Sequence, residues 1–493
     1  MRAFNLSDYL LQHLDKNLTT PVNRQLYRLL RQAILDQVLT IDTRLPSSRD
    51  LALELAISRN TVLYAYEQLL AEGYVEARAG SGTYVADTVP DNMLLPTLKK
   101  TAGKGKNHRA DLSERGRELV KHAGAAPRQW GAFVPGVPDV TQFPHQIWNS
   151  IQNRVWRKPA VASLTYGHGG GYQPLRDAVS EYLIGSRSVA GDSDQVVITN
   201  GIHQSIDLCL RLLGDPGDIA WVEDPCYWGA RNLLSASGIK IRPISVDAEG
   251  MCPNGDDLAV IPRFIFITPS HQYPLGMVMS LARRRALLEY ARQHQCWIIE
   301  DDYDSEFRYG GRPLASLQGM DNDDRVIYMG TFSKTMFPGM RLGYMVLPPS
   351  LATPFITGME ELHRSGQTPL QATMAEFMRQ GHFASHIRRM RIVYGRRNEI
   401  LQATVRKHFD ASEVLVVGTD AGLHLALRFP AGVDDKAIAQ AANTLGIAVR
   451  PLSSYFHRAS NDDTGLVLGY ACVEDLHIEP AFALLAKAIR NNL

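Results

Sequence analysis

Lys334 and its neighbours have the clearest chemical potential in this sequence. The lysine follows an apolar run that is expected to form a buried strand, comes directly after Ser333, and precedes Arg341 by seven residues. A lysine amine in such a place can form a Schiff base with a carbonyl group, while a hydroxyl and an arginine beside it can bind a phosphate group. The pattern predicts a site for pyridoxal 5'-phosphate (PLP), with Lys334 as the catalytic residue that links the cofactor covalently.

A carboxylate at the end of a second apolar run supports this interpretation. Residues 298–302 read Ile-Ile-Glu-Asp-Asp and are followed by Tyr303. PLP requires a carboxylate against its pyridine nitrogen, because the charge pair keeps that nitrogen protonated and the ring able to accept electrons. We assign this role to Asp301, with its neighbour Asp302 as the rival, and place Tyr303 on the phenolic oxygen of the ring.

Two further segments offer contacts to the same cofactor. Thr199–Gln204 is a predicted strand-to-helix turn, and its backbone N–H groups at Ile202 and His203 can hold a phosphate. Tyr227 follows another apolar run and can stack on one face of the ring. Structural alternatives remain, since Tyr227 can be a core residue, and His203 and His271 can be polar core residues that are hydrogen-bonded locally.

The elements that position these residues follow from the apolar runs after about residue 129. Short runs that are apolar on both faces alternate with helical stretches such as Leu281–His294, which predicts a mostly parallel sheet covered by helices on each side. Ligands bind such sheets at the carboxyl ends of the strands, where the polar residues lie. The strand candidates are 196–198, 219–222, 264–267, 297–299, 326–329 and 344–347.

The first 86 residues predict a small helical unit that is closed by a hairpin. Apolar residues recur at helical spacing in three stretches, and two short alternating strands flank a glycine-rich turn at residues 80–82. The start and stop signals of the helices are Pro21, the pair Ser47 and Ser48, Ser58, and finally Gly73.

The order and spacing of these segments resemble the GntR-type winged helix over residues 20–86. The matching strings begin at Leu45-Pro46-Ser47-Ser48-Arg49 and at Ser58-Arg59-Asn60-Thr61. The resemblance implies a DNA-binding domain whose third helix enters the major groove by its N-terminal turn, where arginine can bond guanine and hydroxyls can hold phosphates. The expected DNA contacts are Arg49, Ser58, Arg59, Asn60, Thr61, Gly80 and Gly82. A helical bundle that only mediates protein contacts is the alternative.

The rest of the chain, residues 129–493, resembles the fold-type I aminotransferases, and the whole chain resembles the MocR family of transcription regulators. The latter resemblance is carried by Thr268–Pro274 and by Glu300–Tyr309. It implies an α+β winged helix-turn-helix domain joined to an α/β PLP-binding domain, which has a mostly parallel seven-stranded sheet and a smaller C-terminal α+β subdomain. It also implies a head-to-tail, domain-swapped homodimer in which Tyr166 reaches the phosphate of the partner subunit.

These resemblances and the fading apolar pattern give the expected domain limits. The DNA-binding domain spans 1–86, a flexible basic linker spans 87–128, and the PLP-binding domain spans 129–493. Its large part is expected at about 150–350, and its small part at about 351–493 together with 129–149. The linker is a plain tether or one that also touches DNA phosphates, and its basic residues are Lys99, Lys100, Lys104, Lys106 and Arg109, with no acid in 97–110.

Two positions depart from the aminotransferase pattern. Tyr273 stands before Pro274 where aminotransferases usually have Asn, and Val467 stands where they have the Arg that binds the substrate carboxylate. Arg450 is the nearest substitute, and we name it as the candidate effector-binding residue. Weak or absent transamination turnover is therefore expected.

Composition restricts the remaining possibilities. The net charge is +1, and residues 1–86 hold nine Lys and Arg against nine Asp and Glu, so binding to DNA must come from arranged charge, a dimer or the linker. Five scattered cysteines without CxxC spacing predict neither a disulfide framework nor a thiolate metal cluster, and we expect no metal. Residues 1–17 lack signal-peptide features, and no apolar run of about 18 residues is present, so we expect a cytoplasmic protein.

Three functions are compatible with these observations. The first is a transcription regulator whose binding to operator DNA responds to PLP, or to a small amine or amino acid that reacts with it. The second is a working PLP-dependent aminotransferase that carries a DNA-binding domain. The third is a DNA-binding protein whose large domain has lost PLP. The set of Lys334, Asp301 and Arg341 argues against the third, while the DNA-binding segment and Val467 favour the first over the second.

Overall fold

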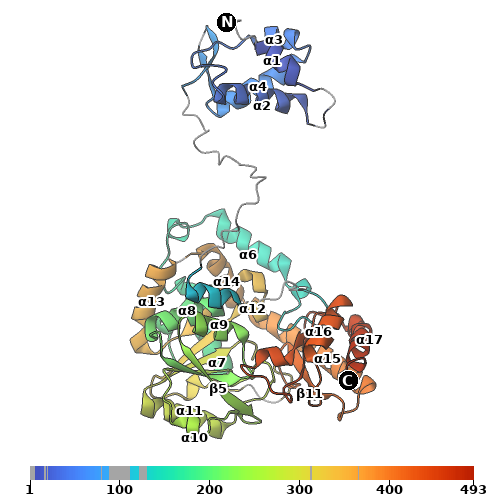
Figure 1. Cartoon of the computed structure of the whole chain (residues 1–493). Coiled ribbons are helices and arrows are strands. Elements are labelled where there is room, and N and C mark those ends of the chain that lie inside the picture. The colour runs from blue at the N-terminus through green and yellow to red at the C-terminus, as the bar shows by residue number, and fades with distance from the viewer. Residues whose placement is uncertain are drawn as a thin grey trace. The chain divides into compact units, whose positions relative to one another are not determined.

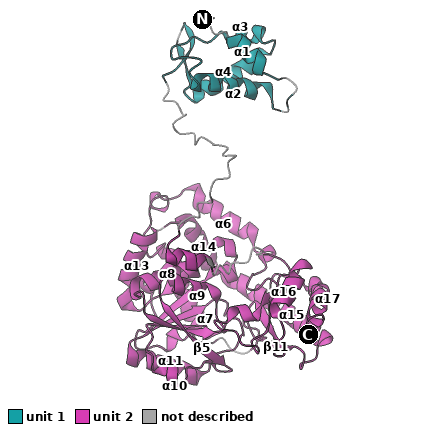
Figure 2. Cartoon of the chain, in the orientation of Figure 1, with its two compact units in different colours: residues 1–110 teal, residues 111–493 magenta. Residues whose placement is uncertain are grey.

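The computed structural model describes residues 6–15, 18, 20–78, 80–87, 112–121, 130–310, 314–364 and 366–493. The chain forms two compact units, residues 1–110 and 111–493 (Figure 2). The expected linker at 87–128 lies mostly outside the described residues, as do its basic residues Lys99, Lys100, Lys104, Lys106 and Arg109. Within that span the structure describes helix α5 (Glu114–Lys121), which is part of the second unit and lies against α9 (Trp228–Ala236).

The first unit contains helices followed by an antiparallel hairpin. Its elements are α1 (Leu6–His13), α2 (Val22–Leu35), α3 (Ser48–Glu54), α4 (Arg59–Ala71), β1 (Val75–Arg78) and β2 (Gly82–Val85). The start signals at Ser47 and Ser58 are confirmed, because their side chains accept hydrogen bonds from the backbone N–H groups of the first turns of α3 and α4. Gly73 follows α4 with a φ of +77°, as predicted.

A small hydrophobic core holds the first unit together. It takes side chains from every helix and from the hairpin, and the fully buried members include Leu10, Leu26, Leu30, Leu51, Val62, Leu69 and Val85. Because these residues fix one face of α4, the N-terminal turn of that helix is left at the surface.

The second unit is built on a sheet with the strand order β3-β10-β9-β8-β7-β4-β5-β6. The six named strand candidates are present, and β5 makes up the seven strands that the resemblance implies. A two-residue strand, β6, is added at one edge. Strands β4, β5, β7, β8 and β9 pair in parallel, whereas β10 runs antiparallel to both of its neighbours. The strands are β3 (Val196–Thr199), β4 (Ile219–Asp224), β5 (Lys240–Asp247), β6 (Gly250–Met251), β7 (Phe264–Ile267), β8 (Trp297–Asp302), β9 (Val326–Thr331) and β10 (Gly343–Val346).

The central strands are apolar on both faces because helices cover both. Along β7, Phe264 and Phe266 pack with α8 (Ile202–Leu213), α9 and α13 (Pro349–His363), while Ile265 and Ile267 pack with α11 (Leu281–His294). Figure 1 shows α8 and α9 on one side of the sheet, and α10 and α11 on the other. The remaining helices of this part are α6 (His145–Arg157), α7 (Gln173–Arg187), α10 (Gly255–Leu258), α12 (Phe332–Thr335) and α14 (Thr368–Arg379).

A smaller α+β part follows the large sheet. Its four strands have the order β11-β12-β14-β13 and are all antiparallel. Its elements are α15 (His382–His408), β11 (Leu415–Val417), β12 (His424–Arg428), α16 (Asp435–Thr444), β13 (Arg450–Pro451), β14 (Gly465–Gly469) and α17 (Asp475–Arg490). The segment near residue 133 joins this part through a bridge between Phe133 and Gly469. None of the helices in the described ranges has the length and apolar content needed to cross a bilayer.

Candidate functional site

One cavity of about 230 Å³ brings most of the predicted cofactor residues together. Strand β9 and helix α12 deliver Ser333 and Lys334, the end of β8 delivers Asp301 and Tyr303, and the first turn of α8 delivers Ile202 and His203. Eight of the nine predicted contacts line this cavity. Its full lining is Ile202, His203, Tyr227, Tyr273, Asp301, Tyr303, Thr331, Ser333, Lys334, Pro338 and Arg341.

The amine of Lys334 is held by backbone rather than by an acid. Its Nζ donates a hydrogen bond to the carbonyl oxygen of Gly136 at 2.7 Å. Burial lowers the pKa of Lys334 below the ordinary range of lysine, although the carboxylates of Asp304 and Asp301 act in the opposite direction. A lowered pKa increases the neutral fraction of the amine, which is its nucleophilic form.

Asp301 is a buried carboxyl group with an unsatisfied oxygen. It is 6% exposed, and its Oδ1 has no hydrogen-bond partner among the described residues. Burial, followed by the charge of Asp302, raises its pKa to about 7. Asp302, the rival for the same role, is satisfied inside the protein, because its Oδ2 accepts hydrogen bonds from Arg187 at 2.7 Å and Tyr328 at 2.6 Å. A positively charged N–H group from a ligand therefore fits Asp301 and not Asp302.

The other end of the cavity can receive an anion. Gly201, with a φ of +93°, precedes α8, and no side chain caps the N-terminus of this helix. A β-carbon at Gly201 would lie 3.6 Å from the guanidinium of Arg341, so the two approach each other closely. The free N–H groups of the first turn of α8 can bind a phosphate, with Ser333 and Arg341 beside them.

Aromatic side chains close one side of the cavity. The hydroxyl of Tyr227 is hydrogen-bonded to Nε2 of His203 at 2.8 Å. The ring of Tyr227 packs edge to face on that of Tyr273, with 5.9 Å between the ring centres. Burial, and then the charge of Arg341, lowers the pKa of His203, which favours the neutral imidazole. Tyr273, which replaces the usual Asn, also packs edge to face on Tyr303 at 5.4 Å. Its hydroxyl donates to that of Tyr455 at 3.4 Å.

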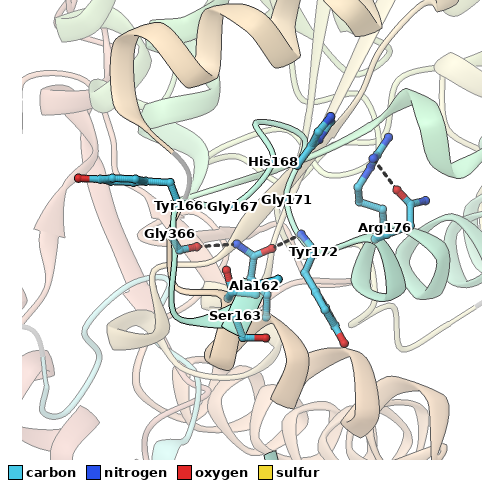
Figure 3. Close-up of a pocket in the computed structure, with 12 residues that line it drawn as sticks. Ala162, Ser163, Tyr166, Gly167, His168, Gly171, Tyr172, Arg176 and Gly366 are labelled. Carbon is cyan, nitrogen blue, oxygen red and sulfur yellow. Dashed lines mark hydrogen bonds between the residues drawn. The ribbon is translucent and has the colours of Figure 1, made fainter. Parts of the chain in front are cut away.

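Tyr166 does not reach this cavity in the single chain. It lines a second cavity of about 330 Å³ with His168, Tyr172 and Arg176, where its ring points away from the other side chains (Figure 3). The side chain is 79% exposed, and the guanidinium of Arg364 lies 5.6 Å from its ring centre.

Arg450 and Val467 occupy facing positions on neighbouring strands. They are direct partners in the antiparallel pairing of β13 with β14, so their side chains project from the same face of that sheet. Val467 is fully buried against Leu275 and Tyr455. Arg450 lies close enough to the hydroxyl of Tyr455 and to the amine of Lys334 for its charge to influence the ionisation of both.

The predicted DNA contacts lie at the starts of α3 and α4 and in the hairpin of the first unit. Ser58 caps α4 by accepting from Thr61 N–H at 3.2 Å, and the next residues, Arg59 and Asn60, are exposed. Arg59 donates to Ser48 Oγ at 3.3 Å, which joins the starts of α4 and α3, and Arg49 is exposed on α3. The remaining two contacts, Gly80 and Gly82, have positive φ values in the hairpin.

Five residues at these sites were absent from the predicted set, and one of them, Tyr273, stood out in the sequence only as a departure from the aminotransferase pattern. Thr331 and Pro338 line the cofactor cavity beside the lysine string, and Gly136 holds the lysine amine from 198 residues away. Arg44 precedes α3 and forms a bridge with Tyr84 of the hairpin, where its Nε would be 3.1 Å from a β-carbon at Gly82. Thr331 and Pro338 could have been found from their closeness to Lys334 in the sequence. Arg44 could have been found because it directly precedes the Leu45-Pro46-Ser47 string. No local sequence pattern points to Gly136.

Comparisons with known proteins agree with this division of the chain. Residues 152–461 match the family model of class I and II aminotransferases, and residues 22–85 match that of bacterial regulatory proteins of the gntR family. The chain is 40% identical to a probable rhizopine catabolism regulatory protein, MocR, of Rhizobium meliloti, over 94% of this chain and 92% of the relative. It is 35% identical to YhdI, an uncharacterized HTH-type transcriptional regulator of Bacillus subtilis, over 96% and 97%.

Solved structures resemble the second unit. The kynurenine aminotransferase of Pyrococcus horikoshii, crystallised in complex with PMP, matches with a TM-score of 0.68 and 27% identity. The match covers 78% of this chain and 95% of that protein.

Proposed function

The chain belongs to the MocR family of transcription regulators, which join a GntR-type helix-turn-helix domain to an aminotransferase domain, and from this we propose how the second unit acts. The aminotransferase fold implies PLP as the cofactor. We propose that PLP is linked to Lys334, and that a small amine which reacts with PLP shifts the protein between states with different affinity for operator DNA. The cavity in which Lys334, Asp301 and Arg341 converge carries this proposal.

The residues of the cavity fit the parts of the cofactor. Bound PLP supplies an aldehyde that condenses with primary amines and a ring that accepts electrons. Asp301 would pair with the pyridine nitrogen, since its Oδ1 is buried without a partner in the described residues. The first turn of α8 at Ile202 and His203, together with Ser333 and Arg341, would bind the phosphate. Tyr227 would cover one face of the ring, and Tyr303 would contact its phenolic oxygen.

Arg450 is our candidate for recognising the effector. An aminotransferase would bind a substrate carboxylate from the position of Val467, which is apolar and fully buried in this chain. Arg450 stands directly opposite on β13 and is close enough to Lys334 for its charge to act there. We propose that Arg450 binds an anionic group of the effector. It would do so from β13, whereas an aminotransferase binds the substrate carboxylate from the position of Val467 on β14.

We propose that the protein acts as a head-to-tail, domain-swapped homodimer. The segment around Tyr166 exposes several apolar side chains on the surface of the single chain, with Val161 80% and Leu164 58% exposed. Such a patch is expected to be covered in a soluble protein. In the dimer, Tyr166 would contact the phosphate bound by the partner subunit.

The DNA-reading surface is proposed to be the start of α4 and the hairpin. Exposed Arg59 and Asn60 lie at the N-terminal turn of α4, where a recognition helix meets base edges. Arg49 and Arg59 would be the main contacts, and Ser58, Thr61, Gly80 and Gly82 would assist them. Arg44 is added to this set by its bridge to Tyr84 of the hairpin.

Borohydride reduction of PLP-loaded protein tests the cofactor proposal. Reduction should fix one PLP covalently onto Lys334, detected by peptide mass spectrometry, and Lys334→Ala should abolish this adduct completely. Lys407→Ala, which removes an exposed lysine paired with Glu479, is the control and should leave the adduct intact. If the wild-type protein shows no adduct on Lys334, the proposal is wrong.

An amine panel separates a sensor from a working aminotransferase. The complete set of Lys334, Asp301 and Arg341 favours reaction with amines, whereas turnover also requires a held carboxylate and an aligned Cα–H bond. We expect amines to change the absorbance of bound PLP and the affinity for operator DNA, with slow or absent transamination. Sustained turnover at about 1 per second or faster, an ordinary enzyme rate, would favour the aminotransferase instead.

A further inference from the structure

Two buried polar side chains, His271 and Asp304, form a chain of hydrogen bonds that ends at Tyr303 in the cofactor cavity. The Nδ1 atom of His271 lies 2.9 Å from the hydroxyl oxygen of Tyr303 and 3.0 Å from Oδ1 of Asp304. His271 is 2% exposed and Asp304 is 1% exposed. Of these three residues, only Tyr303 lines the cavity.

The contacts of the three groups indicate how their protons are arranged. A carboxylate oxygen accepts hydrogen bonds, so we assign the ring proton of His271 to Nδ1, from which it is donated to Asp304. That same N–H is within reach of the Tyr303 oxygen, which therefore accepts from it. Burial, and then the charge of Asp304, raises the pKa of Tyr303 well above its usual value, so the phenol keeps its own O–H. With Nδ1 of His271 as the donor in this contact, the Tyr303 O–H is free to donate into the cavity that this residue lines.

The small part of the second unit holds the pair of His271 and Asp304 in place. A β-carbon at Gly422 would lie 2.2 Å from Cε1 of His271 and 2.7 Å from Oδ2 of Asp304, so only glycine allows this approach. Gly422 is itself fixed, because its N–H donates to the carbonyl of Phe307 at 2.8 Å and its carbonyl accepts from the hydroxyl of Tyr470 at 2.8 Å. The imidazole of His271 consequently has little freedom to turn away from Tyr303.

We infer that Asp304 and His271 are positioning residues that orient the Tyr303 hydroxyl so that it donates its proton into the cavity. There it meets the phenolic oxygen of PLP, so this inference rests on the proposed cofactor site and deepens it. Asp304 sets the tautomer of His271, His271 occupies the acceptor side of the Tyr303 oxygen, and Tyr303 delivers the hydrogen bond. The other ionisable side chains around this chain of contacts are Glu223, Tyr273, Asp301, Lys334 and His424.

A double-mutant cycle on PLP-loaded protein tests the inference. The measured quantity is the apparent pKa of the visible absorbance band of the Lys334-linked cofactor. A donor on the phenolic oxygen stabilises its negative charge, so Tyr303→Phe should raise this apparent pKa by about one to two units. In His271→Gln the side-chain amide no longer occupies the place of Nδ1. This variant should raise the apparent pKa by at least about half of the shift expected for Tyr303→Phe. In the Tyr303→Phe background, His271→Gln should add almost nothing.

Two further variants separate this role from a general loss of structure. His271→Asn keeps an N–H near the place of Nδ1 and should restore most of the wild-type apparent pKa. Asp257→Asn removes a buried carboxylate that pairs with Arg242 away from the cavity, and should lower stability without moving the apparent pKa.

The possible results are distinguishable. An equal shift from His271→Gln in both backgrounds, or no shift in either, would overturn the inference while leaving the cofactor site standing. Absence of a visible band in the wild-type protein would instead overturn the cofactor proposal, and this inference with it.

Discussion

The cofactor cavity and the DNA-reading surface are built in opposite ways. At the cavity and beneath it, polar partners come from distant segments: Lys334 and Gly136 are 198 residues apart, and Arg187 and Asp302 are 115 apart. On the reading surface the partners are closer in the sequence, since Ser58 accepts from the N–H of Thr61 three residues later and Arg59 donates to Ser48 eleven residues earlier. The chemistry of the second unit therefore depends on the whole fold being complete, whereas the reading turn depends on one cap and a small core.

The largest expected effect follows from breaking a distant contact beneath the cavity. The side chain of Arg187 is 5% exposed and donates to Asp302 at 2.7 Å and to Ser270 at 2.6 Å. Arg187→Met leaves the Asp302 carboxylate buried without its charge partner, so the second unit should lose about 3–5 kcal/mol of unfolding free energy. Denaturant unfolding measures this loss. Arg211→Met, which breaks an exposed pair with Asp207, is the control and should change stability by less than about 1 kcal/mol.

The next effect concerns pH and the buried carboxyl group of Asp301. Its pKa is about 7 in the folded protein and about 3.9 in an unfolded chain. Between these values the folded state binds more protons, so the stability of the PLP-free protein should fall as pH rises from about 4 to 7. Asp301→Asn should therefore stabilise the PLP-free protein at pH 8, on the order of 2 kcal/mol, and weaken PLP binding. An unchanged pH profile of unfolding in this variant would contradict the prediction.

A smaller effect is expected on the reading surface. Arg59→Ala should lose about 1–3 kcal/mol of operator affinity and relax discrimination at one base pair. Fluorescence anisotropy with operator DNA and single-base variants measures both quantities. Arg24→Ala removes a charge from an exposed position on α2 and should leave the base preference unchanged; the same relaxation in both variants would show that only net charge matters.

The smallest effect tests the local cap itself. Ser58→Ala removes the acceptor for Thr61 N–H and should lower the stability of the first unit by about 1 kcal/mol, leaving the adduct at Lys334 unaffected. Thermal unfolding followed in parallel with borohydride labelling checks both outcomes. Loss of the Lys334 adduct in Ser58→Ala would contradict the expectation that the two regions are stabilised independently.

Local signals predicted much of the fold. The caps at Ser47 and Ser58, the six apolar strand runs and the helix Leu281–His294 all lie where the sequence pattern places them. Strand β5 was not among the named candidates, because Pro243 and several charged residues interrupt its apolar pattern. It can keep them because it lies near the edge of the sheet, where only two-residue β6 follows it.

The residues of the cofactor cavity could be predicted where a local sequence motif contains them. Eight of the nine named contacts converge because they lie at strand ends on the same edge of the sheet. Seven of them end or follow β3, β4, β8 or β9, and Arg341 precedes β10, which runs antiparallel to its neighbours. The contact of Gly136 with Lys334 has no local pattern, and the position of Arg450 depends on the register of β13 with β14. The proposed place of Tyr166 requires a second subunit, which no pattern within one chain can supply.

Helix α5 has a mechanical consequence. Its residues Arg115 and Leu119 line a hollow with the C-terminal ends of α8 and α9, at Leu210 and Ala236. Both helices begin at the cofactor cavity, α8 with Ile202 and α9 just after Tyr227. Helix α8 has 12 residues and is therefore a rigid element about 18 Å long. A small tilt of α8 at the cavity would displace its far end, which lies beside α5.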